Sequence, residues 1–283
     1  MSTSILKILT LVCAGHANEL HDHTLAESPT NLAKLGKHYA SLNFSQLRPI
    51  ANAHSMVTYR HMLLAYESIL QFNRPTAYIA GDVVECGVWR GGNMFMMIMA
   101  QLHSLYQKHA RHFWLFDTFE GLPEPTSEFD DTRAKKIYSD IASGSASANN
   151  TRFESGKAID NKWNYGPQDV VKWNMAATGY PPSQIHLVRG KVEQSLYAQN
   201  IKLPDQIALL RLDTDWYDST MAELDVLFRR LVPGGLLVID DYCSWGGART
   251  AVNHFFGNMS GGMKLLQRVS AVKPCLHIFK KSA

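Results

Sequence analysis

Four aspartates of this sequence stand where they could act together in catalysis or bind a metal ion. Asp213 and Asp215 directly follow one short apolar run, and Asp240 and Asp241 directly follow the next one. Three or four carboxylates with no histidine beside them suit a hard, oxygen-binding cation such as Mg²⁺, Mn²⁺ or Ca²⁺. Such a cation would hold a substrate hydroxyl, lower its pKa and orient it for reaction. In an alternative interpretation Asp215 caps the helix that follows it, and only Asp213 faces the cleft.

Two further acidic residues precede these aspartates, each at the end of an apolar run. Glu85 opens a glycine-rich turn, ECGVWRGG, in which Gly87 and Gly91 let a ligand approach the backbone. Asp117 lies about 30 residues further on, and its carboxylate can accept hydrogen bonds from both hydroxyls of a ribose. The glycine spacing excludes the dinucleotide-binding fingerprint and the phosphate-binding P-loop. The pattern E-x-G-x-x-x-G after a strand instead resembles that of Rossmann-like, S-adenosylmethionine-dependent methyltransferases.

An alternation of strands and helices must position these acidic residues. From residue 81 onward, short apolar runs alternate with helical stretches, which predicts a parallel, doubly wound sheet. Four of the five parallel strands end at an acidic residue, so we expect the carboxylates to gather at the sheet edge where such folds bind ligands. We predict strands at 83–85, 112–116, 184–188, 207–212 and 236–239, helices at 93–106, 191–199, 219–231 and 247–257, and a closing hairpin of 263–269 and 275–279.

Two regions lie outside this pattern. Residues 1–80 read as helices and loops, with a helix at 58–72, and we interpret them as a helical cover over one α/β domain of residues 81–283. Within that domain a polar insertion spans residues 121–165. Insertions of this length are often active-site lids or disordered segments.

The composition of the 283 residues narrows the class of protein. A formal charge of +3, with no run of basic residues, excludes nucleic acid as the main partner. No run approaches the roughly 20 apolar residues of a membrane span. The apolar segment Ile5–Ala14 contains Lys7 and follows no basic residue, which favours an amphipathic helix over a signal peptide. Four scattered cysteines favour buried thiols in the cytoplasm over a disulfide framework.

Four stretches of the chain together resemble one enzyme family. They are GDVVECGVWRGGN, FDTFEGLP, LLRLDTDWYDST and PGGLLVIDDYCSWGGARTAV, and in this order they cover most of residues 81–257. They look like the TylF/MycF/NovP family of macrolide- and aminocoumarin-sugar O-methyltransferases. The resemblance implies the Rossmann-like class I methyltransferase fold, an α/β fold with a mostly parallel seven-stranded sheet and a C-terminal antiparallel hairpin. It also implies a divalent metal, a lid over the substrate and a homodimer.

The resemblance assigns roles to individual residues. The metal ligands are Asp213, Asp240 and Asp241, and the general base is Asp213, with Asp215 as the neighbouring alternative. Gly190 and Lys191 fall where the adenine end of the cofactor is usually held. The expected S-adenosylmethionine-binding residues are Glu85, Gly87, Trp89, Arg90, Gly91, Asp117, Thr118, Gly190, Lys191 and Asp213. Side chains that either line an acceptor pocket or simply pack in the core are Lys162, Trp163, Tyr165, Trp216, Tyr217, Tyr242, Trp245 and His254.

The sequence therefore predicts one activity and leaves rival functions open. We expect a methyl group to pass from S-adenosylmethionine to a hydroxyl of a small molecule, a sugar or a glycosylated natural product, with Mg²⁺, Mn²⁺ or Ca²⁺ bound. The displacement proceeds in line, and no nucleophile motif suggests a covalent intermediate. The alternatives are metal-independent methylation of nitrogen or carbon on the same fold, a dehydrogenase, which the glycine spacing disfavours, and an inactive relative that serves as a binding or scaffold subunit.

Overall fold

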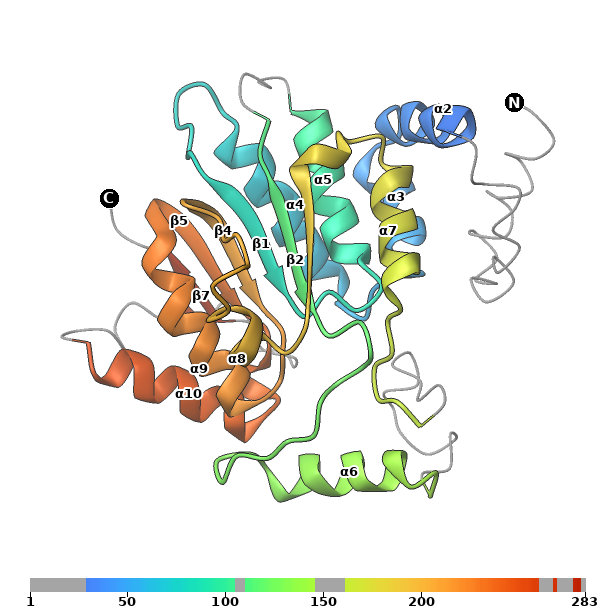
Figure 1. Ribbon diagram of the computed structural model, residues 1–283. Helices are drawn as coiled ribbons and strands as arrows, with labels where there is room; N and C mark the ends of the chain where they lie inside the picture. Colours follow the sequence, from blue (N-terminus) through green and yellow to red (C-terminus); the bar gives the residue numbers. More distant parts are fainter. Residues whose placement is uncertain (1–28, 105–109, 146–160, 260–266, 269–276, 281–283) are drawn as a thin grey trace. The chain divides into compact units, whose positions relative to one another are not determined.

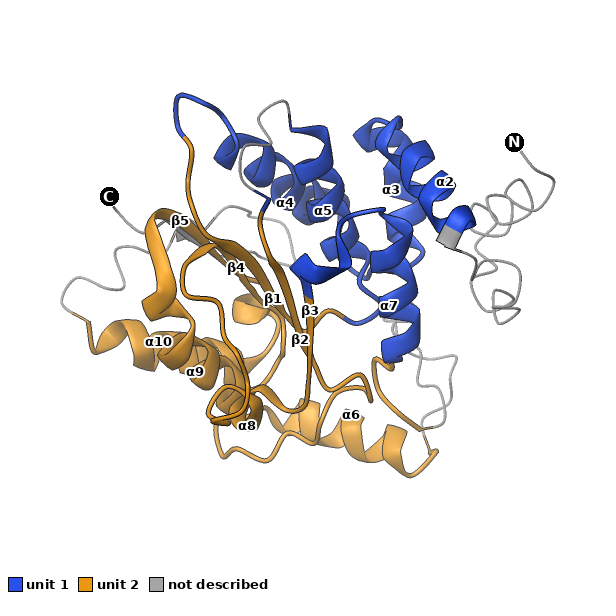
Figure 2. Cartoon of the chain, turned by 45° about the horizontal axis from the view of Figure 1, so that its top comes forward, with its two compact units in different colours: residues 1–77, 89–110, 167–185 blue, residues 78–88, 111–166, 186–283 orange. Residues whose placement is uncertain are grey.

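The computed structural model of the protein describes residues 29–104, 110–145, 161–259, 267–268 and 277–280. The chain divides into two units, which are described separately (Figure 2). Unit 1 comprises residues 1–77, 89–110 and 167–185, and unit 2 comprises residues 78–88, 111–166 and 186–283. The segment Ile5–Ala14, for which an amphipathic helix is predicted, lies outside the described residues.

Unit 2 is built on a seven-stranded sheet (Figure 1). Its strand order is β3-β2-β1-β4-β5-β7-β6. Parallel pairing joins β1 to β2 and to β4, and β4 to β5, whereas β7 runs antiparallel to both β5 and β6. The mostly parallel sheet with a C-terminal hairpin is therefore confirmed. The strands are β1 Asp82–Cys86, β2 Phe113–Asp117, β3 Ile185–Arg189, β4 Ile207–Leu212, β5 Leu231–Ile239, β6 Gln267–Arg268 and β7 His277–Lys280.

Three helices of unit 2 pack against this sheet and against one another. One apolar core joins them to the strands, so that Leu224 of α9 and Phe256 of α10 are fully buried beside Leu210 of β4. Both α9 and α10 begin shortly after an acidic strand end. The packing that buries their apolar faces therefore also fixes the backbone that carries the acidic residues. The helices are α8 Val192–Ser195, α9 Tyr217–Val226 and α10 Gly246–Gly257.

The predicted and observed boundaries differ most at β5 and α8. β5 begins at Leu231 rather than at residue 236, and the helical stretch before it ends earlier than predicted. The sequence Pro-Gly-Gly reads locally as a turn, but pairing of Leu231 with Ile207 on β4 draws it into the strand. Gly234, with φ of 79°, absorbs the resulting shift in register. α8 is also shorter than the predicted 191–199, because the chain continues as turns after Ser195.

The insertion contains a helix that the sequence analysis does not predict. This helix, α6, spans Thr132–Ala142. Its apolar residues recur at helical spacing among lysines and an arginine, and they pack with Trp163, Trp216 and Trp245 in a second apolar cluster. The described part of the insertion is therefore a folded element. Residues 146–160 of the insertion lie outside the described residues.

The described part of unit 1 consists mainly of α-helices. The central helix α5 follows the glycine-rich turn and packs against α2, α3, α4 and α7. Its methionines, such as Met94 and Met97, are completely buried, which agrees with a role in core packing. It ends at His103, before the predicted residue 106. The helices are α2 Pro29–Ala40, α3 Phe44–Asn52, α4 Tyr59–Phe72, α5 Gly92–His103 and α7 Gln168–Ala177.

Two further predictions concern membranes and cysteines. None of the helices in the described ranges has the length and apolar character needed to cross a membrane. Cys86 is a free, buried thiol, as predicted. Cys243, however, is disulfide-bonded. The prediction of a free thiol is wrong there, because disulfide formation depends on a tertiary approach of two cysteines that local sequence does not reveal.

Candidate functional site

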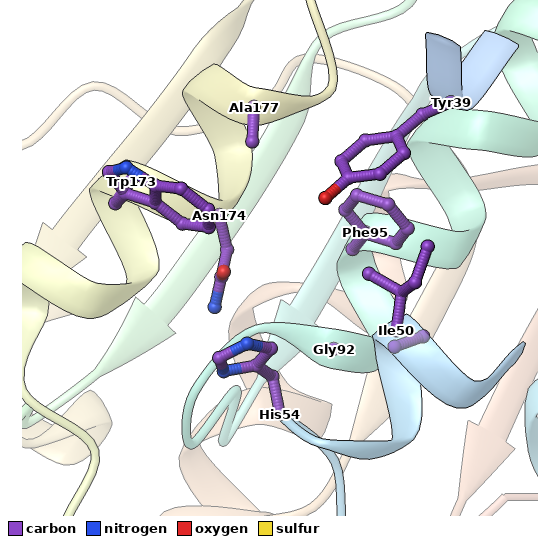
Figure 3. Close-up of a pocket in the computed structure, with 9 residues that line it drawn as sticks. Tyr39, Ile50, His54, Gly92, Phe95, Trp173, Asn174 and Ala177 are labelled. Carbon is purple, nitrogen blue, oxygen red and sulfur yellow. The ribbon is translucent and has the colours of Figure 1, made fainter. Parts of the chain in front are cut away.

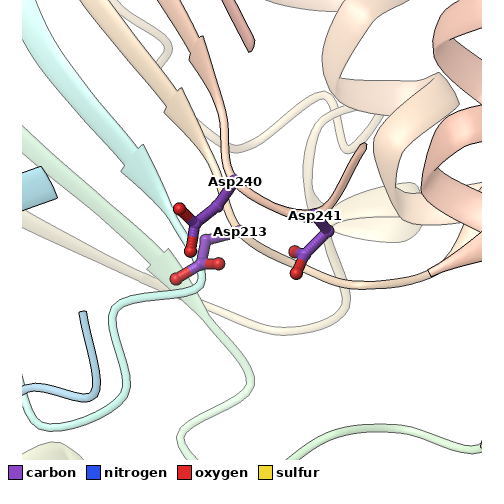
Figure 4. Close-up of side chains that lie close together, drawn as sticks. All are labelled: Asp213, Asp240 and Asp241. Carbon is purple, nitrogen blue, oxygen red and sulfur yellow. The ribbon is translucent and has the colours of Figure 1, made fainter. Parts of the chain in front are cut away.

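The carboxyl ends of β4 and β5 bring three aspartates together (Figure 4). The backbone N–H of Asp213 donates to the Cys86 carbonyl oxygen at 2.9 Å, and that of Asp240 donates to the Leu212 carbonyl oxygen at 3.0 Å. These bonds hold both residues at the edge of the sheet. Carboxylate oxygens of Asp213, Asp240 and Asp241 all lie within 4.8 Å of one another. The three residues expected to bind a metal are thus gathered in one place.

Asp215 belongs to the same group, and we use the name acidic cluster for Asp213, Asp215, Asp240 and Asp241. The backbone of Asp215 has a left-handed φ of 70°, and its N–H donates to the Asp241 carboxylate at 3.2 Å. Its own carboxyl group forms hydrogen bonds with Asp241 and with the side chain of Trp245. The N-cap of α9 is Trp216, and no side-chain hydrogen bond caps the helix there. The alternative in which Asp215 caps this helix is therefore wrong.

A buried arginine lies beside the acidic cluster. Arg211, in the middle of the apolar strand β4, is only 3% exposed. Its guanidinium group pairs with Asp213 at 2.8 Å, with Asp240 at 3.0 Å and with Glu85 of β1 at 2.8 Å. Arg211 is not among the site residues predicted from the sequence, although a charged side chain inside a buried strand next to acidic strand ends is a usable signal. Arg211 thus pairs with Glu85 and with two of the four aspartates, so it offsets only part of the charge of the acidic residues.

The uncompensated charge appears in the pKa values of the cluster. Burial, together with the neighbouring Asp240 carboxylate, raises the pKa of Asp215 to about 6. Burial also raises the pKa of Asp213 well above its ordinary value, against the opposing effect of Arg211. The pKa of Asp241 is raised by burial and by its acidic neighbours. A bound cation would relieve this repulsion, because the carboxylates could then ionise without facing each other uncompensated.

The turn after β1 is shaped by the backbone of Asp213. Gly87 has φ of 78°, and its N–H donates to the Phe116 carbonyl oxygen at 2.8 Å. A Cβ atom on Gly87 would lie 1.9 Å from the Asp213 carbonyl oxygen. The close passage of two strand ends therefore requires this glycine, whereas the sequence analysis explained it by ligand approach. Glu85 is buried and ion-paired with Arg211.

Asp117 is held in a fixed orientation at the end of β2. One carboxylate oxygen accepts the Val88 N–H and the other accepts the Phe119 N–H, each at 2.8 Å. The Asp117 carbonyl oxygen accepts the N–H of Gly190 at 3.0 Å. The Thr118 hydroxyl lies a further 3.4 Å from the oxygen that accepts the Phe119 N–H. The structure therefore brings Asp117 and Gly190 together and orients the carboxylate that is predicted to bind the ribose.

Thr118 and Lys191 are the chain neighbours of this pair. The Thr118 hydroxyl donates to the Gly121 carbonyl oxygen at 2.7 Å, at the entry to the insertion. The Leu122 N–H donates to the Trp163 carbonyl oxygen at 2.7 Å, which ties the two ends of the insertion together. Lys191 is exposed and occupies the N-cap position of α8. The insertion therefore starts directly from the predicted cofactor residues.

Three of the predicted cofactor residues fall in unit 1. Trp89 has a left-handed φ of 49°, and the guanidinium carbon of Arg90 lies 4.9 Å from the centre of its ring. Gly91 has φ of 82° and is the N-cap residue of α5. The Arg90 carbonyl oxygen accepts a hydrogen bond from Asn174 at 2.8 Å. These contacts hold the second half of the glycine-rich turn within unit 1.

A small cavity of about 10 Å³ lies behind this turn in unit 1 (Figure 3). Tyr39 and Phe95 line one side, and Asn174 lines the other, with His54 next to Gly92. The His54 carbonyl oxygen accepts the Gly92 N–H at 2.8 Å. Burial, and then the nearby positive charge of Arg90, lower the pKa of His54 to about 4. His54 is therefore a neutral, buried residue that supports the start of α5.

The eight side chains considered for an acceptor pocket divide into two groups. Trp163, Trp216 and Trp245 are buried and pack on one another, with ring centres between 5.4 and 5.8 Å apart. These three tryptophans are part of an apolar core, which agrees with the interpretation that they pack in the core. The other five make contacts at more open positions. Tyr217 pairs with His254, the Lys162 ammonium lies over the Tyr165 ring, and Tyr242 donates to Asn253.

Comparisons with known proteins point to one family. The family described as Macrocin-O-methyltransferase (TylF) matches residues 43–154 and 146–264. The 8-demethyl-8-(2,3-dimethoxy-alpha-L-rhamnosyl)-tetracenomycin-C 4'-O-methyltransferase of Streptomyces olivaceus is 30% identical over 181 residues, 63% of this chain and 59% of that protein. The mycinamicin III 3''-O-methyltransferase of Micromonospora griseorubida is 30% identical over 166 residues, 58% of this chain and 56% of that protein. The chain thus aligns with somewhat more than half the length of each relative.

A solved structure supports the architecture. The structure of the O-methyltransferase NovP matches with a TM-score of 0.63 at 20% sequence identity, over 82% of this chain and 84% of that chain. At this identity the likeness speaks for the fold, and it confirms the Rossmann-like methyltransferase fold predicted from the sequence. The family match extends over far more than half of the residues, from the helices of unit 1 to the end of α10. The chain belongs to the Macrocin-O-methyltransferase (TylF) family.

Proposed function

We propose that this protein is an S-adenosylmethionine-dependent O-methyltransferase that uses a divalent cation held by Asp213, Asp240 and Asp241. The observation that carries the proposal is the convergence of these three carboxylates, within 4.8 Å of one another, in a chain of the TylF family. The donor set fits the metal, since Mg²⁺ and its relatives prefer carboxylate oxygens. The negative charge that Arg211 leaves uncompensated supports the same assignment.

The acceptor we infer is a hydroxyl of a small molecule that carries a sugar. One relative is named for a rhamnosyl-tetracenomycin and the other for mycinamicin III, and both names specify methylation of an oxygen. Because each alignment covers only 59% and 56% of those proteins, the acceptor class rests on the names and on the intact acidic cluster together. We therefore propose a sugar or a glycosylated natural product as the acceptor.

We assign separate roles in binding and in the reaction to residues of unit 2. S-adenosylmethionine, when bound, would supply the methyl group, and a cation held by Asp213, Asp240 and Asp241 would lower the pKa of the acceptor hydroxyl and orient it. The Asp117 carboxylate accepts hydrogen bonds from the ribose hydroxyls, because two backbone N–H groups already orient it. Gly190 and Lys191 lie beside it for the adenine end. The cofactor-binding roles stay predictions for all ten residues, Glu85, Gly87, Trp89, Arg90, Gly91, Asp117, Thr118, Gly190, Lys191 and Asp213.

Asp213 and Asp215 are the candidates for the residue that accepts the hydroxyl proton. Asp213 lies among the metal-binding carboxylates, but one of its oxygens is paired with Arg211 at 2.8 Å. Asp215 is not paired with Arg211, and its pKa of about 6 suits a base that works near neutral pH. The pH–rate profiles of Asp213→Asn and Asp215→Asn separate them, since the variant without its base loses the acidic limb that reports the base.

Arg211 also favours a second candidate function, which is methyl transfer without a metal. Its buried guanidinium already supplies one positive charge to Asp213 and Asp240. With that cation in place, the acidic cluster could orient an amine or a hydroxyl directly by hydrogen bonds. Full activity in EDTA would select this function over the metal-dependent one.

The decisive experiment measures transfer of a labelled methyl group to glycosylated small molecules, with Mg²⁺ and with EDTA. The proposal expects transfer that needs Mg²⁺ and that fails in Asp240→Asn. Binding of S-adenosylhomocysteine, followed by calorimetry, is the independent readout. An inactive scaffold relative would show no binding of S-adenosylhomocysteine, and a dehydrogenase would be stabilised by NADH instead.

Three predictions about the whole protein accompany the proposal. The resemblance favours a homodimer, which light scattering behind size-exclusion chromatography would measure. A cytoplasmic location and the division into a helical segment 1–80 and a methyltransferase domain 81–283 likewise stay predictions. Expression of residues 81–283 alone would test the division, since an independent domain should unfold cooperatively.

A further inference from the structure

A short segment at the start of the insertion contacts the first residues of both α9 and α10. We call this segment, Phe129–Arg133, the anchor. One carboxylate oxygen of Asp130 accepts the backbone N–H of Tyr217 at 2.9 Å, and Asp131 accepts the backbone N–H of Gly246. Neither helix is capped by a side chain from its own N-cap residue. Two consecutive aspartates of the insertion therefore satisfy N–H groups that would otherwise lack a partner, at the positive ends of two helix dipoles.

The glycine pair at the start of α10 makes room for these carboxylates. A Cβ atom on Gly247 would lie 2.1 Å from a carboxylate oxygen of Asp130, and one on Gly246 would lie 2.5 Å from Asp131. Neither glycine has a positive φ, so backbone conformation does not require them. In the sequence WGGARTAV, the anchor thus fills the space that side chains at the two glycines would occupy.

Side chains on both sides of the two aspartates extend the contact. The Phe129 ring lies 4.4 Å from the Tyr217 ring and 5.2 Å from the His254 ring, centre to centre. The Arg133 guanidinium lies 4.5 Å from the centre of the Trp245 ring and donates to the Ser244 carbonyl oxygen at 3.4 Å. The anchor therefore holds α9 and α10 through four of its five residues.

These contacts fall directly beside the acidic cluster. α9 begins two positions after Asp215, and the Ser244–Gly246 contacts follow closely after Asp241. Any movement of the anchor would change the distance between the insertion and the four aspartates. Asp130 is 6% exposed, so its carboxylate is built into the structure rather than resting on its surface.

We propose that Asp130 and Asp131 are positioning residues that fix residues 129–142, with α6, against α9 and α10 and so set one wall of the acceptor site. The inference rests on the proposed function, which places the acceptor hydroxyl at the acidic cluster. It deepens that function, because it names the two helix caps that hold residues 129–142 beside that cluster.

The test compares Asp130→Ala/Asp131→Ala with the conservative Asp130→Asn/Asp131→Asn, whose amide oxygens can still accept the two N–H groups. Gly247→Ala displaces the Asp130 carboxylate without removing it. Asp140→Ala is the matched control, because Asp140 lies on α6 of the same insertion and, among the described residues, its carboxylate pairs with Lys136 and caps no helix. The first readout is trypsin cleavage after Arg133, Lys135 and Lys136, followed by mass spectrometry on the full chain.

If the anchor holds the insertion in place, trypsin cleavage should become about 30-fold faster in the double alanine variant, because two helix caps are lost together. Gly247→Ala should increase the cleavage rate by a smaller factor. The double asparagine variant and Asp140→Ala should be cleaved at a rate near that of the wild type. The second readout is kinetic. The acceptor KM should rise about tenfold in the double alanine variant while the affinity for S-adenosylhomocysteine stays unchanged.

Unchanged cleavage in the double alanine variant would overturn the proposal, and so would equal effects of the alanine and asparagine pairs. Faster cleavage with an unchanged acceptor KM would overturn the acceptor-wall role. If the wild-type protein transfers no methyl group at all, the proposed function fails, whereas the cleavage readout still decides whether the anchor exists.

Discussion

The acidic cluster of unit 2 and the surroundings of His54 in unit 1 both bury ionisable groups next to an arginine. Burial is the largest cause of the pKa shift in both regions, and it favours the neutral form of each group. The arginines act in opposite ways. Arg211 is a counter-ion to the carboxylates, whereas Arg90 repels a protonated His54.

The difference between the two regions bears on the proposed metal site. His54 relieves its burial simply by staying neutral, with a pKa of about 4, so nothing further is needed at physiological pH. The acidic cluster has several buried carboxyl groups beside Arg211, and burial raises the pKa of Asp213 and Asp241 well above the ordinary value, so their ionised forms are poorly compensated. A region that folding leaves with uncompensated charge is suited to a cation, whereas a region that folding neutralises is structural.

The largest expected effect comes from removing the internal counter-ion. Arg211→Met should lower the free energy of unfolding by about 3–5 kcal/mol, because it leaves buried carboxylates without their partner. Arg211→Lys should restore part of the loss, and added Mg²⁺ should restore more. Urea denaturation measures all three. Arg189→Met is the matched control in the same unit, since its partner Glu120 is exposed and such pairs contribute about 0–1 kcal/mol. Equal stability of Arg211→Met and the wild type in EDTA would contradict the comparison.

The next largest effect is the pH dependence of stability that His54 causes in unit 1. The folded state lowers the pKa of His54 from 6.5 to about 4, so the unfolded chain takes up a proton first as pH falls. The stability that this residue contributes is present above pH 6.5 and is lost between there and about pH 4, by about 3 kcal/mol. Denaturation of wild type and His54→Asn at several pH values measures it as a difference. A His54 ring that titrates near 6.5 by NMR would show that burial does not act as stated.

A somewhat smaller effect is the response of unit 2 to metal. Mg²⁺ at 100 times its dissociation constant should raise the free energy of unfolding by about 2.7 kcal/mol. The increase should shrink as pH falls, because burial raises the pKa of the proposed ligands Asp213 and Asp241 well above the ordinary value and protons then compete with the metal. Thermal denaturation with Mg²⁺ and with EDTA at two pH values checks both points. A Mg²⁺ effect that survives in Asp241→Asn would place the metal elsewhere.

The smallest expected effect is the loss of a helix cap in unit 1. Asn43 caps α3 by accepting the Gln46 N–H at 3.1 Å, and the Gln46 side chain accepts the Asn43 N–H at 3.0 Å. Asn43→Ala should therefore cost about 1 kcal/mol, as lost caps commonly do. The response to Mg²⁺ should stay as in the wild type, because this cap lies in unit 1 and touches no carboxylate. A changed Mg²⁺ response in this variant would mean that the two regions are not independent.

Local patterns in the sequence were enough to place the acidic residues at strand ends. Asp213 and Asp240 follow apolar runs, and in a parallel sheet such runs end at the same edge. The structure brings them together as expected. The same reasoning failed at Leu231, where Pro-Gly-Gly reads as a turn but pairing with β4 makes it a strand. It also missed α6, whose apolar positions are hidden among charged residues of the insertion.

By itself, the sequence determined the order of elements, the carboxylates at the strand ends and the family resemblance, because these follow from residue types and short spacings. Only the tertiary structure decided that Arg211 pairs with Glu85, which lies 126 residues away in the chain. It likewise decided that Gly87 is required by the Asp213 backbone and that Asp130 and Asp131 cap two distant helices. The physical reason is that burial, pairing of charges and steric exclusion depend on distances across the fold, which no local pattern encodes.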